Sequence, residues 1–481
     1  MVRSTMLRVW IAALASLPAL AAADQTPTQL WARQVGTSEY DTVQALAPGN
    51  GGSFFATGTT TGDLAGVNLG SQDVFLGRYS GAGAPQWMIQ FGTSDYESPA
   101  VGGMCSDGVD GVYIAGETTG ALGGPVIGLS DGWLARFDGS GNRLWALQIG
   151  TTNFDGITGI APDGSGGVYI VGYTRGSLAA TNAGDTDVFI ARYDASKTQL
   201  WIRQFGTPGA DEAWAMTPDS VGGVFFGGLT SGNLGAVHAG SGDAWVARYD
   251  ASGTRTWIRQ YGSMEHDRTR ALASDGAGGV FVAGSTQGSL LSPTKGGEDI
   301  FLIRVNEFGS SVWSSQIGTT GGEHPISVCL DGMDGLLMTG GAYGNFGGPS
   351  IGDYDVFMAN FDSAGTQKWV QKLGTTTYDY PSSIITDKAS GFYVAGMTEG
   401  VIGASSAGAY DGFIVRYGTG CYANCDGSTA LPVLNVNDYV CFLNHYAAAD
   451  PYANCDDSTA APILNVNDFI CFMNNYATGC P

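Results

Sequence analysis

Charged side chains are scarce in this sequence, and basic ones are the scarcest. Only 14% of the 481 residues are charged, and 21 Lys and Arg stand against 44 Asp and Glu, which gives a net charge of −23. A surface this acidic repels nucleic acids and anionic membrane surfaces, so we expect binding to neither. After residue 23 no apolar run reaches the roughly 18 residues that a membrane-spanning helix needs. We therefore expect no membrane span in the mature chain.

Several catalytic motifs are also missing. The sequence holds no G-x-S-x-G nucleophile elbow, no H-E-x-x-H zinc motif and no phosphate-binding loop. These absences argue against the corresponding hydrolases and nucleotide-binding enzymes. Asp and Glu are abundant enough to supply the two carboxylates of a glycosidase, so the sequence leaves that reaction open.

The start of the chain has the pattern of a secretory signal. Arg3 and Arg8 are followed by an apolar stretch over residues 9–20 and by three alanines before Asp24. This order of basic, apolar and small residues predicts a signal peptide at residues 1–23 that is removed on export. The alternative is a membrane anchor, for which the apolar stretch is short. We therefore expect a secreted, extracellular or cell-surface protein.

Glycine is plentiful, and its 76 residues recur at fixed places in a long repeat. Seven tryptophans mark the repeat, spaced 56 residues apart except for one interval of 58: Trp31, Trp87, Trp145, Trp201, Trp257, Trp313 and Trp369. Each unit has four short runs of alternating β-branched and aromatic residues bounded by Gly, Asp and Ser, which predict four antiparallel strands. Seven such sheets arranged radially form a β-propeller. The predicted fold class is all-β, with the propeller over residues 24–419.

The repeat is out of phase with the ends of the propeller. It opens on a Trp strand, residues 30–35, and ends on a third strand, residues 411–417, so the seventh sheet lacks its fourth strand. Pairing the first strand with the last sheet closes the ring and leaves no unpaired backbone edge. An open solenoid is the alternative, and it explains the offset less well. We expect the closed propeller to be monomeric.

The repeated unit contains three sequence motifs in order: W-x-x-Q-x-G-T, G-G-V-Y-I-x-G-x-T-x-G and D-x-F. It resembles the bacterial SBBP-type β-propeller repeat over residues 31–417. The resemblance implies a seven-bladed ring on a secreted or surface protein. It implies no activity, because that family carries no catalytic signature.

An acidic residue stands ten places after every Trp, at the predicted start of each innermost strand. These residues are Asp41, Glu97, Asp155, Asp211, Asp267, Glu323 and Asp379. Such a ring of carboxylates can hold a cation or a polyhydroxylated ligand. However, a feature present in every blade is better explained as architecture, each carboxylate capping a turn or accepting backbone N–H bonds.

Departures from the repeat are better candidates for a site, because the fold does not require them. His266 with Asp267, and Glu323 with His324, begin two adjacent blades. We predict a ligand-binding cluster there, which could also supply an acid and a base. Asn360, where the other blades have Arg, is a departure without an evident chemical use.

The composition changes in residues 420–481, which contain six Cys, six Asp and no Lys or Arg. This segment is a tandem repeat of period 30, in which an oxygen-rich loop leads into a helix-like apolar stretch at residues 439–446 and again at 469–476. Side-chain oxygens that end in a carboxylate at a helix start are typical of calcium loops. The predicted ligands are Asn424, Asp426, Ser428, Asn435 and Asp438 in the first copy, and Asn454, Asp456, Ser458, Asn465 and Asp468 in the second.

The segment resembles a dockerin domain, in particular a cysteine-containing bacterial variety. The resemblance implies two Ca²⁺ sites and docking to a cohesin-like receptor through the helices. Two features depart from the pattern: about three extra residues lengthen each loop, and each loop closes on Asp where EF-hands have Glu. We therefore predict a small C-terminal dockerin-like α domain with two calcium loops.

The six cysteines of this segment allow 15 pairings. The symmetry of the repeat favours Cys425 with Cys441 and Cys455 with Cys471, which leaves Cys421 and Cys480 to join the ends. A disulfide-stabilised knot without metal is an alternative to the calcium domain, and the two can coexist. A zinc site is a further alternative, disfavoured by export to an oxidising compartment.

The sequence thus predicts a non-catalytic exported propeller that binds a ligand or protein partner, tethered through a calcium-dependent dockerin-like module. The alternative is a carbohydrate-active enzyme, a glycoside hydrolase or lyase, with its site in the propeller mouth. A structural surface protein is a third hypothesis. The ligand, carbohydrate or protein, is not identified by the sequence.

Overall fold

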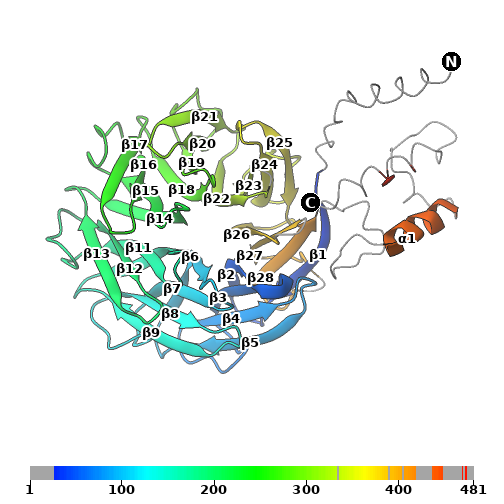
Figure 1. The fold of residues 1–481 in the computed structure, drawn as a ribbon, viewed down its shortest axis with the longest axis horizontal. Coiled ribbons are helices and arrows are strands. Elements are labelled where there is room, and N and C mark those ends of the chain that lie inside the picture. Colours follow the sequence, from blue (N-terminus) through cyan, green and yellow to red (C-terminus); the bar gives the residue numbers. More distant parts are fainter. Residues whose placement is uncertain are drawn as a thin grey trace, which may run out of the picture.

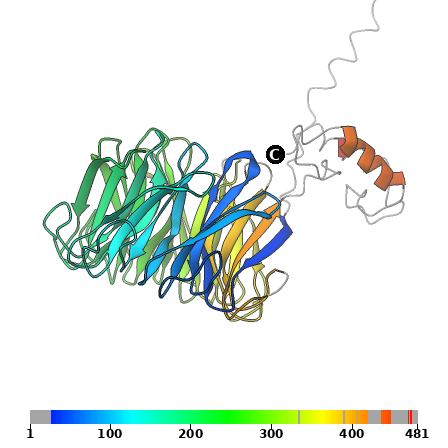
Figure 2. The ribbon, with the colours of Figure 1, turned by 90° about the horizontal axis from the view of Figure 1, so that it is seen from below.

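The computed structural model describes residues 26–332, 335–387, 391–403, 406–418 and 436–447, together with Phe469, Phe472 and Met473. The β-strands form seven four-stranded antiparallel sheets arranged as the blades of a ring (Figure 1). The predicted all-β, seven-bladed propeller is therefore confirmed. Seen from the side, the ring is a short cylinder with two end faces (Figure 2).

The bounds of the strands follow the repeat. Blade 1 contains β2 (Asp41–Pro48), β3 (Phe54–Thr60), β4 (Asp73–Tyr79) and β5 (Pro85–Phe91). Blade 2 contains β6 (Glu97–Ser106), β7 (Val112–Thr118), β8 (Asp131–Phe137) and β9 (Arg143–Ile149). Blade 3 contains β10 (Asp155–Pro162), β11 (Val168–Thr174), β12 (Asp187–Tyr193) and β13 (Gln199–Phe205). Blade 4 contains β14 (Asp211–Pro218), β15 (Val224–Thr230), β16 (Asp243–Tyr249) and β17 (Arg255–Tyr261).

The remaining blades have the same order. Blade 5 contains β18 (Asp267–Ser274), β19 (Val280–Thr286), β20 (Asp299–Val305) and β21 (Ser311–Ile317). Blade 6 contains β22 (Glu323–Leu330), β23 (Leu336–Ala342), β24 (Asp355–Phe361) and β25 (Gln367–Leu373). Blade 7 contains β26 (Asp379–Thr386), β27 (Gly391–Thr398), β28 (Asp411–Gly418) and β1 (Thr28–Val35). A single 3-10 turn, η1 (Asn50–Gly52), lies between β2 and β3.

The first strand of each blade is the innermost and contacts the first strand of the next blade, so these seven strands surround the central channel. We call the end of the ring where they begin face A; it carries the loops between second and third strands and those that lead to the next blade. Face B, the opposite end, carries the turns between first and second strands and between third and fourth strands.

The middle strands are almost continuously apolar because neighbouring blades cover both of their faces. β11 reads Val-Tyr-Ile-Val-Gly-Tyr-Thr, and only Tyr173 among its seven residues is not buried. The core is therefore divided among the spaces between blades. One cluster, for example, joins Phe225 and Trp257 of blade 4 to Val282 and Phe301 of blade 5.

The ring is closed by the predicted pairing. β1 is antiparallel to β28, with Thr28 opposite Gly418 and Val35 opposite Gly412, and it completes blade 7 (Figure 1). Strands almost four hundred residues apart in sequence thus share one sheet. The closure gives each of the seven sheets four strands, so no described blade lacks its outermost strand.

In six of the seven blades the repeated Trp joins its blade to the next at face B. Trp257 Nε1 donates to the carbonyl of Glu307, 2.9 Å away, in the turn between the third and fourth strands of blade 5. Arg248, opposite Trp257 in blade 4, donates to the same carbonyl and is held by Asp219 at 2.9 Å. Gly309 of that turn has φ +78°, and a Cβ there would meet the indole of Trp257 at 2.9 Å. The positive φ and this close approach explain the glycine.

This bond recurs around the ring. The same Trp-to-carbonyl bond is made by Trp31, Trp87, Trp145, Trp201 and Trp313. The matching Arg-to-carbonyl bond is made by Arg78, Arg136, Arg192 and Arg304. We call this Trp–Arg–carbonyl unit the face B staple.

The staple explains the departure at Asn360 in blade 6. An Arg at that position would reach for the turn between the third and fourth strands of blade 7. Blade 7 has no such turn, because β28 ends at Gly418 and its fourth strand, β1, begins at Thr28. Asn360 bonds only within its own blade: its Nδ2 donates to Asp331 Oδ2 at 2.9 Å and to the Leu336 carbonyl at 3.3 Å. The substitution follows from the closure of the ring.

In the C-terminal segment the structure describes one helix, α1 (Val436–Ala447), which contains the first predicted apolar stretch. Phe442 stacks on Phe472 with ring centroids 4.1 Å apart, and both side chains are fully buried. Tyr439 contacts Phe469 edge to face. These residues occupy equivalent places in the two 30-residue copies, so the copies pack through their matching aromatic side chains. Among the described residues no helix is long and apolar enough to cross a membrane.

Candidate functional site

The predicted ring of acidic residues consists of fully buried side chains. Asp211 is representative: its Oδ2 accepts the backbone N–H of Thr207 at 2.5 Å and the Thr207 hydroxyl at 2.9 Å, and Thr230 donates to Oδ1. Thr207 lies in the loop that enters the blade, so the carboxylate fixes that loop to the innermost strand. All seven residues have no exposed surface. We call these seven carboxylates the latch residues, or latches. Each holds its loop to the innermost strand, and none faces the channel.

A second buried carboxylate, at the start of each third strand, lies beside the latch. Asp187 Oδ2 accepts a bond from Gln204 Nε2 at 2.9 Å, and a Cβ on Gly206 would clash with both Asp187 and Asp211. Burial raises the pKa of Asp211, hydrogen bonds from Thr230 and Thr207 oppose the rise, and the charge of Asp187 adds to it. Blade 6 replaces the Gln by Lys372, whose Nζ lies 2.7 Å from the Asp355 carboxylate.

The predicted cluster at the start of blades 5 and 6 is only partly accessible. Asp267 and Glu323 are latches, fully buried like the others. His266 lies at the rim of face A, where its backbone bridges Gly242. His324 Nδ1 lies 3.4 Å from Glu298, and its Nε2 bonds the Tyr354 hydroxyl. Of the four predicted residues, the two histidines are therefore the ones that reach the rim.

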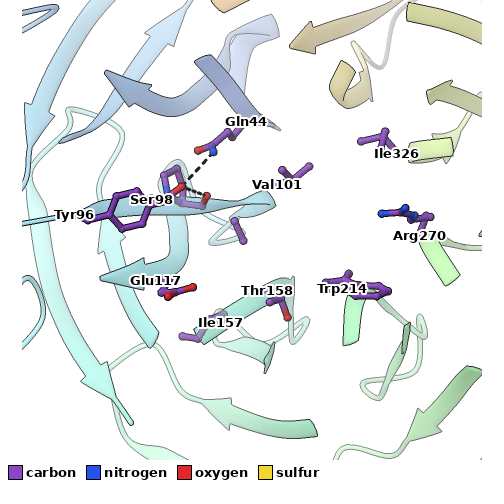
Figure 3. A pocket seen from close by; sticks show the side chains of 12 residues that line it. Gln44, Tyr96, Ser98, Val101, Glu117, Ile157, Thr158, Trp214, Arg270 and Ile326 are labelled. Carbon is purple, nitrogen blue, oxygen red and sulfur yellow. Dashed lines mark hydrogen bonds between the residues drawn. The ribbon is translucent and has the colours of Figure 1, made fainter. Parts of the chain in front are cut away.

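The channel is lined by a different position, three places after each latch. There the register of the first two strands shifts, as between Ala213 and Ala215, so the residue between them is unpaired. This bulge position holds a different residue in each blade: Gln44, Ala100, Thr158, Trp214, Arg270, Ile326 and Ser382. All but Ser382 line one cavity in the channel (Figure 3). Ser382 is buried and donates to Val43 O.

The irregular interval of 58 residues in the repeat is explained at the same place. In blade 2, four residues stand between the paired Pro99 and Met104, where blade 3 has only Thr158 and Gly159 between Ile157 and Ile160. The longer bulge carries Val101, whose side chain is 52% exposed, into the channel (Figure 3). The one insertion in the repeat therefore changes the channel wall.

The cavity has a volume of about 390 Å³ and mixes apolar, aromatic and charged side chains. Arg270 lies over the ring of Trp214, 5.9 Å from its centroid. On the opposite wall, Ser98 accepts from Gln44 at 3.2 Å, and Glu117 accepts from the Tyr173 hydroxyl at 2.9 Å (Figure 3 shows the first pair). A second cavity of about 300 Å³ adjoins the first, sharing Thr158 and Trp214.

Two charged residues line the cavity, Arg270 and Glu117, and Glu298 lies near Arg270. Burial lowers the pKa of Arg270, and the nearby Glu298 opposes this. Burial raises the pKa of Glu298, but His324, Ser285 and Arg270 together outweigh it and hold the value at about 2. Glu298 is therefore ionised at neutral pH. A small molecule or a peptide side chain with both polar and apolar surface fits these walls.

Most of the C-terminal sites predicted from the sequence lie outside the described residues. Asp438 is described: it lies in the first turn of α1 and is fully buried. The ligands predicted from the sequence are all oxygen donors, which suit a hard cation such as Ca²⁺, and Asp438 is the one that the structure describes. Cys441 forms a disulfide; the other five cysteines of the segment are not described, so the pairing stays a prediction. In the propeller Cys105 and Cys329 are free thiols.

Comparison with known proteins gives a limited picture. No family model matches the chain. Among curated proteins, the regulatory protein FlaEY of Caulobacter vibrioides is 24% identical over 376 aligned residues, a match that covers 65% of this chain. The match covers only 38% of FlaEY, so this chain spans about two fifths of that relative.

Three solved structures show a general likeness, each with a TM-score of 0.43. A protein of unknown function from Dyadobacter fermentans is 11% identical and covers 82% of this chain and 99% of its own. YCF48 bound to D1 peptide is 11% identical and covers 84% and 99%. Drosophila Plexin A in complex with Semaphorin 1b is 8% identical and covers 83% and 88%. At these scores the likenesses carry no argument about function.

Proposed function

We propose that the protein is an exported, non-catalytic propeller that binds a ligand in its channel at face A and is tethered through a calcium-dependent, dockerin-like C-terminal module. One observation supports the binding role. The bulge position, which varies from blade to blade, and the single insertion in the repeat line the same cavity. A wall made of different residues in each blade can recognise an asymmetric ligand, which a uniform ring cannot.

The likeness to a protein named as regulatory supports a binding role over a catalytic one. The carboxylates that could have formed a glycosidase pair at blades 5 and 6, Asp267 and Glu323, are buried and bonded to Ser263 and Thr319. Neither is placed to protonate or attack a sugar in the channel. The burial of these two carboxylates therefore favours a binding module over a glycosidase.

The channel role is tested by ¹⁹F NMR on full-length protein labelled with 5-fluorotryptophan. The resonance of Trp214 is assigned by its loss in Trp214→Phe, and that of Trp257, which is buried between blades at face B, serves as the internal control. The probes are short peptides, free amino acids and neutral oligosaccharides, each at millimolar concentration. At least one class should shift Trp214 and leave Trp257 unchanged. If no class shifts Trp214, the channel is not the binding site.

The tether is proposed from the sequence of the C-terminal copies and from the buried carboxylate of Asp438. When bound, Ca²⁺ would draw together the loop oxygens and fix the start of each helix. The residues that would hold it are the ten predicted ligands, Asp438 among them. By the dockerin resemblance, the helices that follow would then present the surface for a cohesin-like receptor.

A calcium titration of the full-length protein tests this second part. Differential scanning calorimetry should show a transition that moves to higher temperature with millimolar Ca²⁺ and returns on addition of EDTA. Asp438→Ala should remove the shift. No change in any transition at millimolar Ca²⁺ would refute the calcium assignment and leave the channel proposal untouched.

A further inference from the structure

Six tyrosines from three blades meet on face A, in a sector where the chain closes on itself. They are Tyr343 and Tyr354 of blade 6, Tyr378, Tyr380 and Tyr410 of blade 7, and Tyr40 of blade 1. We call this group the tyrosine arc. At the places of Tyr378, Tyr380 and Tyr354, blade 3 holds Phe154, Gly156 and Thr186, and blade 4 holds Ala210, Glu212 and Gly242. The arc is therefore a local departure from the repeat.

The rings of the arc form two groups, and within each group the rings are in contact. Tyr354 lies 4.7 Å from Tyr343 and 5.1 Å from Tyr380, measured between ring centroids, and Tyr378 is stacked on Tyr380 with planes 9° apart. Tyr40 lies 5.2 Å from Tyr410. The two groups are joined through Met397, which is paired with Tyr380 and accepts the Tyr40 hydroxyl at 3.2 Å.

The fold is adapted to hold the centre of the arc. The Tyr354 ring lies where a side chain on Gly341 would be, since a Cβ there would meet it at about 2 Å or less. Its hydroxyl bonds His324, which is placed next to Glu298. Tyr354 is 3% exposed, whereas Tyr343 is 46% and Tyr40 36% exposed. The buried ring thus supports rings that open to solvent.

The arc has polar groups that suit hydroxyls and few that suit charge. Among the described residues, the hydroxyls of Tyr343, Tyr378 and Tyr380 have no hydrogen-bond partner, while Tyr410 donates to Glu399. The bond to Glu399 and then burial raise the pKa of Tyr410 to about 12. Burial, and then the neighbouring tyrosines and Glu399, raise the pKa of Tyr380. A ligand here meets aromatic faces, free phenols and one carboxylate.

We propose that the tyrosine arc binds a neutral carbohydrate chain. The C–H faces of sugar rings stack on aromatic faces, and sugar hydroxyls can donate to a carboxylate and exchange bonds with phenols. The carboxylate and the net charge of −23 disfavour anionic polysaccharides. An arc of rings that crosses three blades suits an extended chain better than a single sugar. The proposal is independent of the channel, because no residue of the arc lines that cavity.

Affinity electrophoresis of the full-length protein tests the proposal. The gels contain a soluble β-glucan, a neutral xylan or a galactomannan, and polygalacturonate serves as the anionic counterpart. At least one neutral polymer should retard the protein, and polygalacturonate should not. Tyr380→Ala and Tyr40→Ala should each weaken the retardation about ten-fold, the loss expected for one stacking contact. Tyr380→Phe keeps the ring and should retain most of the binding.

The matched control is Phe154→Ala, since Phe154 occupies the repeat position of Tyr40 in blade 3 and is 43% exposed. It should bind like the wild type. Tyrosine nitration of the wild type, followed by mass spectrometry, gives a second test that needs no variant. The bound polymer should protect Tyr40 and Tyr343 and leave Tyr96 reactive. The proposal is overturned if no neutral polymer binds, if binding survives both alanine variants, or if only an added protein protects the arc.

Discussion

The two faces of the ring are built under different constraints. On face B the same Trp, Arg and turn carbonyl recur from blade to blade, and the one missing Arg, at Asn360, is missing because its partner turn does not exist. In the channel the bulge position carries a different residue in every blade, and on face A the rim positions also vary between blades. The comparison separates residues that the ring needs from residues that it tolerates. Binding is expected among the second group.

The largest expected difference is between two Trp-to-Ala changes, one at a residue that the ring needs and one at a residue that it tolerates. Trp257→Ala should lower the free energy of unfolding by about 3–5 kcal/mol, because this Trp is 8% exposed, packs between blades and bonds the next turn. Trp214→Ala, in the channel, should cost less than about 1 kcal/mol. Urea unfolding followed by circular dichroism measures both. Equal losses would show that the channel residue is also structural.

An exchange between blades 4 and 6 sharpens the account of the staple. Arg248→Asn gives blade 4 the residue of blade 6 and should cost about 1–2 kcal/mol, because the bond to Glu307 is lost while Asp219 keeps a partner. The reverse change, Asn360→Arg, should gain less than about 0.5 kcal/mol, since blade 7 offers no turn to bind. Thermal unfolding of the two variants checks this asymmetry. A clear gain from Asn360→Arg would contradict it.

The pH dependence of stability distinguishes the latches from the face B ion pairs. Burial raises the pKa of latches such as Asp211, so the folded state holds their proton more tightly than the unfolded chain does. That contribution is present below about pH 4 and is lost as the pH rises through the raised value. Burial also raises the pKa of Asp163, but bonds from Ser165, Arg192 and Gly167 outweigh it and lower the net value. Its contribution is present above about pH 4 and is lost as the pH falls.

The two groups together predict a maximum of Tm in mildly acidic solution, with a decline towards neutral pH and another in stronger acid. Calorimetry between about pH 3 and pH 8 measures the curve. Asp211→Asn should flatten the decline towards neutral pH, because it removes one of the raised groups. A Tm that rises steadily up to neutral pH would mean that burial does not raise the pKa of the latch carboxylates.

Much of the ring could be predicted from the sequence, because a feature repeated seven times leaves few interpretations. The Trp period, the offset at the ends and the buried latch residues all follow from the repeat. The channel was missed, although its signals were present: the interval of 58 residues, and the varied position that holds Trp214 and Arg270. The tyrosine arc could not be read from the sequence, because Tyr40 meets Tyr380 only after the ring has closed.

One variant tests the separation of the two groups most directly. It replaces Gln44, Thr158, Trp214, Arg270 and Ile326 by serine, the residue that blade 7 has at this bulge. If these residues are tolerated and not required, the five changes together should lower Tm by less than the single change Trp257→Ala does. A larger drop would contradict the account, because it would show that the varied wall of the channel helps to hold the ring together.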